Sequence, residues 1–105
     1  RRDTNHAAIE DVFRQMLGDH VTDSSAWGDG AGDLFVSWGA FPGCFIEIKR
    51  DAKAEYTAHQ IRFKNTHPLA VRRCNDVDQA IRICKEIRAQ AADMAFSKML
   101  DRAEP

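Results

Sequence analysis

The chain has 105 residues, of which 44% are hydrophobic and 30% are charged, and its formal net charge is −1. This length suits one domain with one core, and this apolar content excludes an intrinsically disordered chain. No run of about 18 apolar residues is present, which excludes a membrane-spanning helix. We therefore expect a single domain over residues 1–105, located in the cytoplasm without a targeting signal.

The first predicted element is an amphipathic helix over residues 4–17, because its apolar residues recur at helical spacing. These residues are Ala8, Ile9, Val12, Phe13, Met16 and Leu17. Residues 18–32 are rich in Gly, Asp and Ser. This composition predicts a loop, from which Val21 or Trp27 would reach into the core.

A β-hairpin is predicted next. Residues 33–38 and 44–49 are short runs rich in β-branched and aromatic side chains, and residues 39–43 join them with two glycines and a proline. Side chains alternate along a strand, so Glu47 and Lys49 should share one face of the second strand, about 7 Å apart.

A second helix is predicted over residues 56–67, where Thr57 and Gln60 have the spacing of a capping box. Pro68 would end this helix. Residues 69–74 read as a third strand. Because a helix separates this strand from the hairpin, the two should pair in parallel through a crossover.

The last predicted element is a long helix over residues 75–105, whose periodic pattern weakens near residues 88–92. Its expected core positions are Val77, Ala80, Ile81, Cys84 and Ile87. Farther along lie Met94, Phe96, Met99 and Leu100, which would either pack on the sheet or supply a homodimer interface. The elements predict an α/β fold with a small mixed sheet flanked by helices, in the order α-β-β-α-β-α.

Three cysteines are present, at widely separated positions: Cys44, Cys74 and Cys84. An odd number at this spacing does not indicate a disulfide framework or a zinc site. We expect reduced thiols that pack as small core side chains.

One group of charged residues points to chemistry. Asp33 lies at the start of the first hairpin strand and Glu47 near the end of its antiparallel partner, so the hairpin should bring them together beside Lys49. Two unpaired carboxylates would repel each other. Mg²⁺ is commonly held by one or two carboxylates, water and substrate phosphate, so we predict a magnesium site open to a phosphate group.

Basic residues gather in the middle of the chain, and a phosphate-bearing partner would suit them. The candidates for contact with nucleic acid are Arg50, Lys53, Arg62, Lys64, Arg72 and Arg73. A solvated surface is the alternative interpretation.

Asp33, the Glu47–Lys49 pair and a helix that carries Gln60 together resemble the PD-(D/E)xK nuclease superfamily. The layout of about residues 9–88 is similar to its small virus-type replication–repair nuclease branch, the VRR-NUC domain. In that branch a Glu on the first helix, here Glu10, precedes the Asp. The family usually has Pro before the Asp, where this chain has Gly32.

The resemblance implies a restriction-endonuclease-like core and a role for each matching residue. Asp33 and Glu47 would bind one or two Mg²⁺, with Mn²⁺ able to substitute, and the carbonyl of Ile48 would be a further ligand. Lys49 would position the attacking water or stabilise the developing anion. Two roles are less direct: Glu10 would reach the metal through water, and Gln60 would orient Lys49 or the phosphate.

Each of these residues also has a purely structural interpretation. Asp33 would cap a turn, and Glu47 with Lys49 would form a surface pair. Glu10 would be a solvated helix residue, and Gln60 would only close its capping box.

The other aromatic and imidazole side chains are assigned mainly to structure. Trp27 and Trp38 are expected in the core, with stacking on bases as the alternative. His6 and His59 are expected at the surface and not as metal ligands.

The expected function is that of a Mg²⁺-dependent endodeoxyribonuclease of a bacterial or phage-infected cell. Branched or structured DNA is the expected substrate, as for a junction-resolving enzyme of phage or repair type. The alternatives are a DNA-binding module on the same fold without catalysis, and a sequence-specific restriction or homing nuclease.

Overall fold

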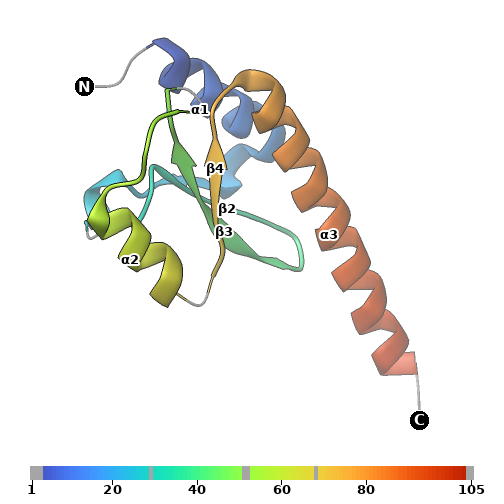
Figure 1. Ribbon diagram of the computed structural model, residues 1–105. Helices are drawn as coiled ribbons and strands as arrows, with labels where there is room; N and C mark the ends of the chain where they lie inside the picture. Colours follow the sequence, from blue (N-terminus) through green and yellow to red (C-terminus); the bar gives the residue numbers. More distant parts are fainter. Residues whose placement is uncertain (1–3, 29, 51–52, 68, 104–105) are drawn as a thin grey trace.

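The computed structural model describes residues 4–28, 30–50, 53–67 and 69–103. Four strands form one sheet in the order β1-β2-β3-β4. The pairs β1–β2 and β2–β3 are antiparallel, and β3–β4 is parallel. The elements are α1 (Thr4–Leu17), β1 (Val21–Asp23), β2 (Leu34–Trp38), β3 (Phe41–Ile48), α2 (Ala58–Thr66), β4 (Val71–Cys74) and α3 (Val77–Ala103), with short 3₁₀ helices η1 (Gly18–His20) and η2 (Ser25–Trp27) (Figure 1).

The α/β fold with a mixed sheet, a hairpin and a parallel strand is therefore confirmed. The loop predicted over residues 18–32 was partly wrong, because it contains β1 and both 3₁₀ helices. β1 has three residues and only Val21 of them is buried, so it has almost no hydrophobic period to recognise. The hairpin turn is also tighter than expected, since β3 already begins at Phe41.

Helices cover both faces of the sheet. On one face, α1 and α3 enclose the main core, and Figure 1 shows α2 on the other side of the strands. The alternation predicted for β3 is confirmed. Cys44, Ile46 and Ile48 belong to the core beneath α1 and α3, whereas Phe45 contacts Phe63 of α2 at 4.9 Å between ring centroids. The face with Phe45 also carries Glu47, so α2 covers the face on which the charged residues lie.

The capping box predicted for α2 is present. The Gln60 amide donates to Thr57 Oγ1 at 3.2 Å, and the Thr57 amide donates to Gln60 Oε1 at 2.8 Å. The helix is shorter than predicted, from Ala58 to Thr66, and Pro68 lies outside the described residues. The cap by the Thr57 hydroxyl fixes where the first turn of α2 begins, and it thereby fixes the position of Gln60.

The long terminal helix is continuous, so the break considered near residues 88–92 does not occur. Figure 1 shows its second half running past the edge of the sheet. Ile83 is buried where Ile81 was expected, and the last buried position is Ala91. Beyond it, four large apolar side chains are exposed: Met94, Phe96, Met99 and Leu100.

All three cysteines are free and buried, as predicted. Burial raises the pKa of the Cys44 and Cys74 thiols to about 11. These cysteines are therefore protonated core side chains at neutral pH. Among the described residues, no helix combines the length and apolar character needed to cross a membrane.

Candidate active site

Asp33 lies between β2 and the preceding loop, which carries Gly28, Gly30 and Gly32 and is called the glycine-rich loop below. Its amide donates to the carbonyl of Ile46 at 2.9 Å, which continues the hairpin ladder by one residue. Its carboxylate oxygen Oδ2 accepts from the amide of Ile48 at 2.8 Å. Asp33 is thereby held against the end of β3, next to the segment that carries Glu47 and Lys49.

Glu47, Lys49 and Gln60 form one hydrogen-bonded group between β3 and α2. The amide nitrogen Nε2 of Gln60 donates to Glu47 Oε1 at 2.6 Å. Lys49 Nζ donates to Gln60 Oε1 at 2.8 Å and lies 3.6 Å from Glu47 Oε1. The Gln60 side chain therefore closes the capping box and also forms hydrogen bonds with both charged residues. Its role in a reaction stays a prediction.

Burial dominates the electrostatics of Glu47, which is 5% exposed. Loss of hydration, and after it the negative charge of Asp33, raise its pKa from 4.5 to about 7, although Lys49 opposes this shift. A carboxylate whose charged form is disfavoured in this way gains from a nearby cation.

Asp33, Glu47 and Gln60 line one pocket of about 160 Å³. Its other wall is the glycine-rich loop, including Gly30 and Gly32, whose φ angles are +80° and +86°. A Cβ at Gly32 would stand 3.1 Å from the Ile46 carbonyl oxygen and 3.5 Å from Glu47 Oε2, so the loop passes close to the end of β3. Both carboxylates therefore border this pocket, and the glycine-rich loop lines it together with Ser25 and Ala31.

A solved structure described as "VRR_NUC domain protein" is similar to this chain with a TM-score of 0.62 and 18% sequence identity, covering 83% of this chain and 89% of that chain. The chain has the fold of a VRR_NUC domain protein. This agreement confirms the predicted resemblance at the level of the fold. No family model matches the sequence, and no curated protein matches it either.

Within this VRR_NUC-like fold the donor set suits a hard divalent cation. The described hydrogen bonds use Oδ2 of Asp33 and Oε1 of Glu47, and both carboxylates border the pocket. No group of three or more His, Cys, Asp or Glu side chains suited to a metal ion occurs within the described ranges. Two carboxylates with water and phosphate oxygens are a common donor set for Mg²⁺, so the residues fit the predicted ion.

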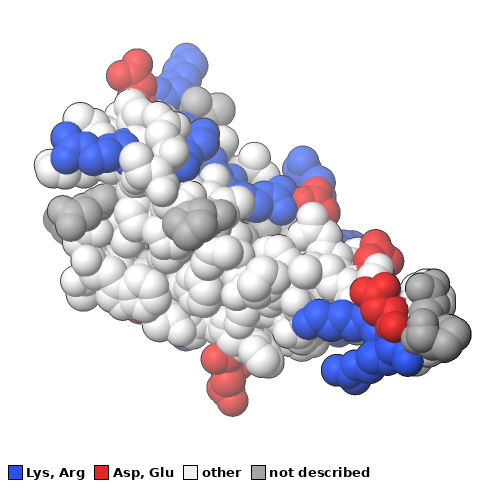
Figure 2. Space-filling model, turned by 90° about the horizontal axis from the view of Figure 1, so that it is seen from below, with Lys and Arg blue, Asp and Glu red and all other residues white. Residues whose placement is uncertain are grey.

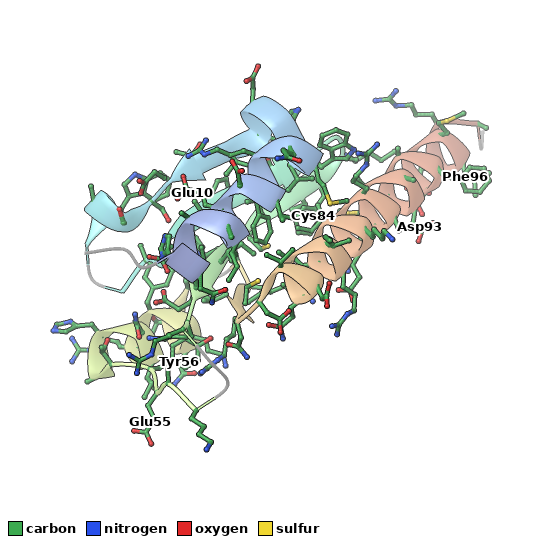
Figure 3. The ribbon with its side chains drawn as sticks, turned by 90° about the horizontal axis from the view of Figure 1, so that it is seen from above. Glu10, Glu55, Tyr56, Cys84, Asp93 and Phe96 are labelled. Atoms are coloured by element: carbon green, nitrogen blue, oxygen red, sulfur yellow. The ribbon has the colours of Figure 1, made fainter. Side chains whose placement is uncertain are left out.

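Glu10 is held by neighbours on its own helix. Arg14 Nε donates to Glu10 Oε2 at 3.0 Å, and His6 Nε2 lies 3.7 Å from Oε1. Figure 3 shows Glu10 on α1, apart from Tyr56 beside α2. Glu10 is not among the charges that shift the pKa of Glu47, so its role in the site stays a prediction. His6 was expected at the surface, but its side chain is only 11% exposed because it packs beside Glu10.

Two of the six predicted basic residues, Arg72 and Arg73, lie on opposite faces of the sheet. In the parallel register of β3 and β4, Arg73 lies opposite Glu47 and Arg72 lies opposite Ile46. Arg72 also forms an ion pair of 2.7 Å with Glu86 of α3. Arg72 therefore points to the opposite face from Arg73, because side chains alternate along β4, and its contact with nucleic acid stays a prediction. In the view from below, Lys and Arg lie along the upper border of the molecule with some acidic residues among them, and charges of both signs lie at the end of α3 (Figure 2).

Three cations surround the ring of Tyr56, a residue for which the sequence predicted no role. Lys49 Nζ, Lys64 Nζ and the Arg73 guanidinium carbon lie 5.3, 5.2 and 5.6 Å from its centroid. The other predicted basic residues are exposed: Arg50, Lys53 and Arg62. An aromatic residue directly before a capping box was the available signal, but nothing in the sequence placed β4 beside it.

The close contact of Gly30 with the start of α2 was not predicted either. A Cβ there would lie 2.5 Å from the backbone of His59, so the glycine-rich loop packs directly on the start of α2. His59 itself is exposed, as predicted.

The two tryptophans behave differently. Trp38 is partly buried and stacks on the Arg88 guanidinium at 4.5 Å. Trp27 is 54% exposed, so its predicted place in the core was wrong.

Proposed function

We propose that this protein is a Mg²⁺-dependent endodeoxyribonuclease that hydrolyses phosphodiester bonds in branched or structured DNA. The observation that supports this most directly is that Asp33 and Glu47 line one pocket on a VRR_NUC-like fold, with Lys49 Nζ 3.6 Å from Glu47 Oε1. The similar structure is that of a VRR_NUC domain protein, and we propose for this chain the nuclease activity that the resemblance implies.

Asp33 and Glu47 would hold the ion, and the carbonyl of Ile48 is the further ligand we propose. Bound there, Mg²⁺ would activate water and balance charge on the phosphate. Mn²⁺ is expected to substitute for it. Relief of the repulsion between the two carboxylates would contribute to the binding of either ion.

The side chains set the rest of the reaction. Hydrolysis adds water across one P–O bond, which leaves a phosphate monoester on one fragment and a hydroxyl on the other. Gln60 holds the Lys49 ammonium at 2.8 Å, so this charge is available to orient the water and to stabilise the oxyanion on phosphorus. Glu47 keeps Gln60 in place through a hydrogen bond of 2.6 Å.

The substrate class is the finer part of the proposal. Lys64 and Arg73 lie around Tyr56 next to Lys49, where they would contact phosphates that flank the cut. Contacts to phosphate do not distinguish one base sequence from another, so they favour recognition of DNA shape over recognition of sequence. We also propose a homodimer, because two sites are needed to cut two strands symmetrically.

The first test compares Lys49→Ala with the wild type on branched, flapped and linear DNA, with Mg²⁺, with Mn²⁺ and with EDTA. We expect cleavage to fall by roughly a hundredfold or more, because a positioned charge at the oxyanion is lost. Binding of DNA, measured by anisotropy, should remain.

Lys98→Ala is the matched control, since it removes an exposed lysine from the far half of α3. It should leave cleavage unchanged. If the wild type cuts none of these substrates with either metal, a DNA-binding module without catalysis replaces the nuclease. Preferential cutting of one linear sequence would favour a restriction-type enzyme.

A further inference from the structure

Trp27 is an exposed aromatic side chain that is held in place by contacts with the sheet. It exposes 54% of its surface. Its ring centroid lies 6.1 Å from that of Phe35 and 5.9 Å from that of Phe45. The aromatic residues of the sheet therefore hold the indole while more than half of it stays open to solvent.

The turn that carries Trp27 is hydrogen-bonded to the segment that carries Asp33. The Trp27 amide donates to the carbonyl of Ser24 at 3.0 Å, and the Ser24 amide donates to the carbonyl of Asp33 at 3.0 Å. Ser24 is completely buried, and its hydroxyl donates to the carbonyl of Gly32 at 3.1 Å. These bonds fix the position of Trp27 relative to Asp33.

The same turn borders the pocket of the proposed active site. Ser25 and Gly28, which stand on either side of Trp27 in the chain, line that pocket together with Asp33 and Glu47. Gly28 has a φ angle of +77°, which lets the backbone turn sharply after the tryptophan. The turn that carries the indole thus borders the pocket where a phosphate would be cut.

The cations of the site gather around Tyr56, and Gln60 links this group to the pocket. A nucleotide bound at the pocket could place its phosphate near Lys49 and its base against an aromatic surface. Bases in duplex DNA are already stacked on their neighbours, so only an unpaired base is free to stack on a side chain.

We infer that Trp27 stacks on an unpaired base next to the phosphate at the Asp33–Glu47 pocket. This inference rests on the proposed nuclease function and narrows its substrate to DNA with at least one unpaired nucleotide. Trp27 is a positioning residue in this scheme. Loss of one stacked base should weaken binding by about tenfold.

The chain has two tryptophans, which makes the contact measurable by fluorescence. In Trp38→Phe the emission comes from Trp27, and in Trp27→Phe it comes from Trp38. Both variants are titrated in EDTA with a single-stranded oligonucleotide and with a duplex, while anisotropy of labelled DNA reports binding independently. We expect the single strand to quench Trp27 strongly, the duplex to quench it weakly, and neither to quench Trp38.

Affinity supplies the second readout. Trp27→Leu should bind single-stranded or flapped DNA about tenfold more weakly and bind duplex unchanged, whereas Trp27→Phe should retain most of the affinity. Trp27 emission that does not respond to single-stranded DNA, or that responds equally to duplex, would overturn the inference. Cleavage without quenching refutes the stacking alone, and quenching without cleavage of any DNA refutes the nuclease alone.

Discussion

Glu47 is a carboxylate that the sheet buries and then surrounds with donors. Gln60 Nε2 and Lys49 Nζ both approach its Oε1, yet loss of hydration still raises its pKa to about 7. A buried charge is usually kept only where its partners are well placed, and here those partners are the other residues of the site. Burial of the Glu47 carboxylate therefore lowers the stability of the fold, and packing of the strand alone does not require this group.

This cost should appear in the pH dependence of folding. The pKa of Glu47 is about 7 in the folded chain against an ordinary 4.5, so the folded state holds its proton more tightly. The contribution of Glu47 to stability is thus fully present below pH 4.5 and is lost as the pH rises through 7. Glu47→Gln, which keeps the shape, should therefore be more stable than the wild type above pH 7, by on the order of 3 kcal/mol.

Urea unfolding of both proteins across the pH range, in EDTA, measures this difference. The two stability curves should converge at low pH, because Glu47 is then protonated in both the folded and the unfolded chain and is neutral like glutamine. Mg²⁺ at alkaline pH should then stabilise the wild type and have much less effect on the variant. Parallel curves at all pH values would show that Glu47 titrates normally.

At the scale of elements, the site depends on how α2 sits against the glycine-rich loop. Gly30 has a φ angle of +80°, and an added Cβ would lie 2.5 Å from the backbone of His59, one residue before Gln60. Backbone cannot yield as a flexible side chain can, so either the loop or the helix start must move. A displaced helix start would carry Gln60 away from Glu47 and Lys49.

We predict that Gly30→Ala destabilises the protein by about 3 kcal/mol and lowers cleavage, because overpacking adds to backbone strain. Gly18→Ala is the matched control. Gly18 also has a positive φ angle, +59°, but an added Cβ would have nothing within 4 Å. Its cost should be the strain alone, about 1 kcal/mol. Equal losses of stability in thermal unfolding would show that the loop and α2 are not in tight contact.

Elements with a strong period could be predicted from the sequence, and short ones could not. Residues 4–17 show a clear helical pattern, and α1 spans them. β1 is held mainly by its hydrogen bonds to β2, and a three-residue strand leaves no pattern of its own. The long helix was expected to weaken where its buried face ends at Ala91, but intrinsic helix propensity carries it onward.

The site follows the same division. Asp33, Glu47 and Lys49 could be placed together because a hairpin and strand alternation fix them by local rules. Tyr56 and Trp27 could not, because their positions depend on where α2, β4 and η2 pack on the sheet. Arg72 shows the limit of reasoning from charge alone. It lies next to Arg73 in sequence and on the opposite face of the sheet.

At the scale of the whole molecule, the part of α3 beyond Ala91 is exposed in the described part of the chain. Figure 1 shows it extending past the sheet, and Figure 3 shows Phe96 pointing away from the body. Ala92, Phe96, Met99 and Ala103 recur at a spacing of three and four residues, which places them along one side of the helix. Phe96 and Met99 are 60% and 65% exposed.

Such a stripe suits helix pairing with a second copy of the chain, which is the homodimer we propose. Phe96→Ser combined with Met99→Ser should shift the protein from dimer to monomer in sedimentation velocity. The melting temperature of the dilute protein should change little, because these side chains leave no cavity in the core.

Met94→Ser is the control for this pair. Met94 is 38% exposed on the same stretch of α3 but lies off the stripe, so its loss should preserve the dimer. A wild-type protein that sediments as a monomer over a wide range of concentration would remove α3 as an interface. It would then leave the two strands of a substrate to be cut in separate binding events.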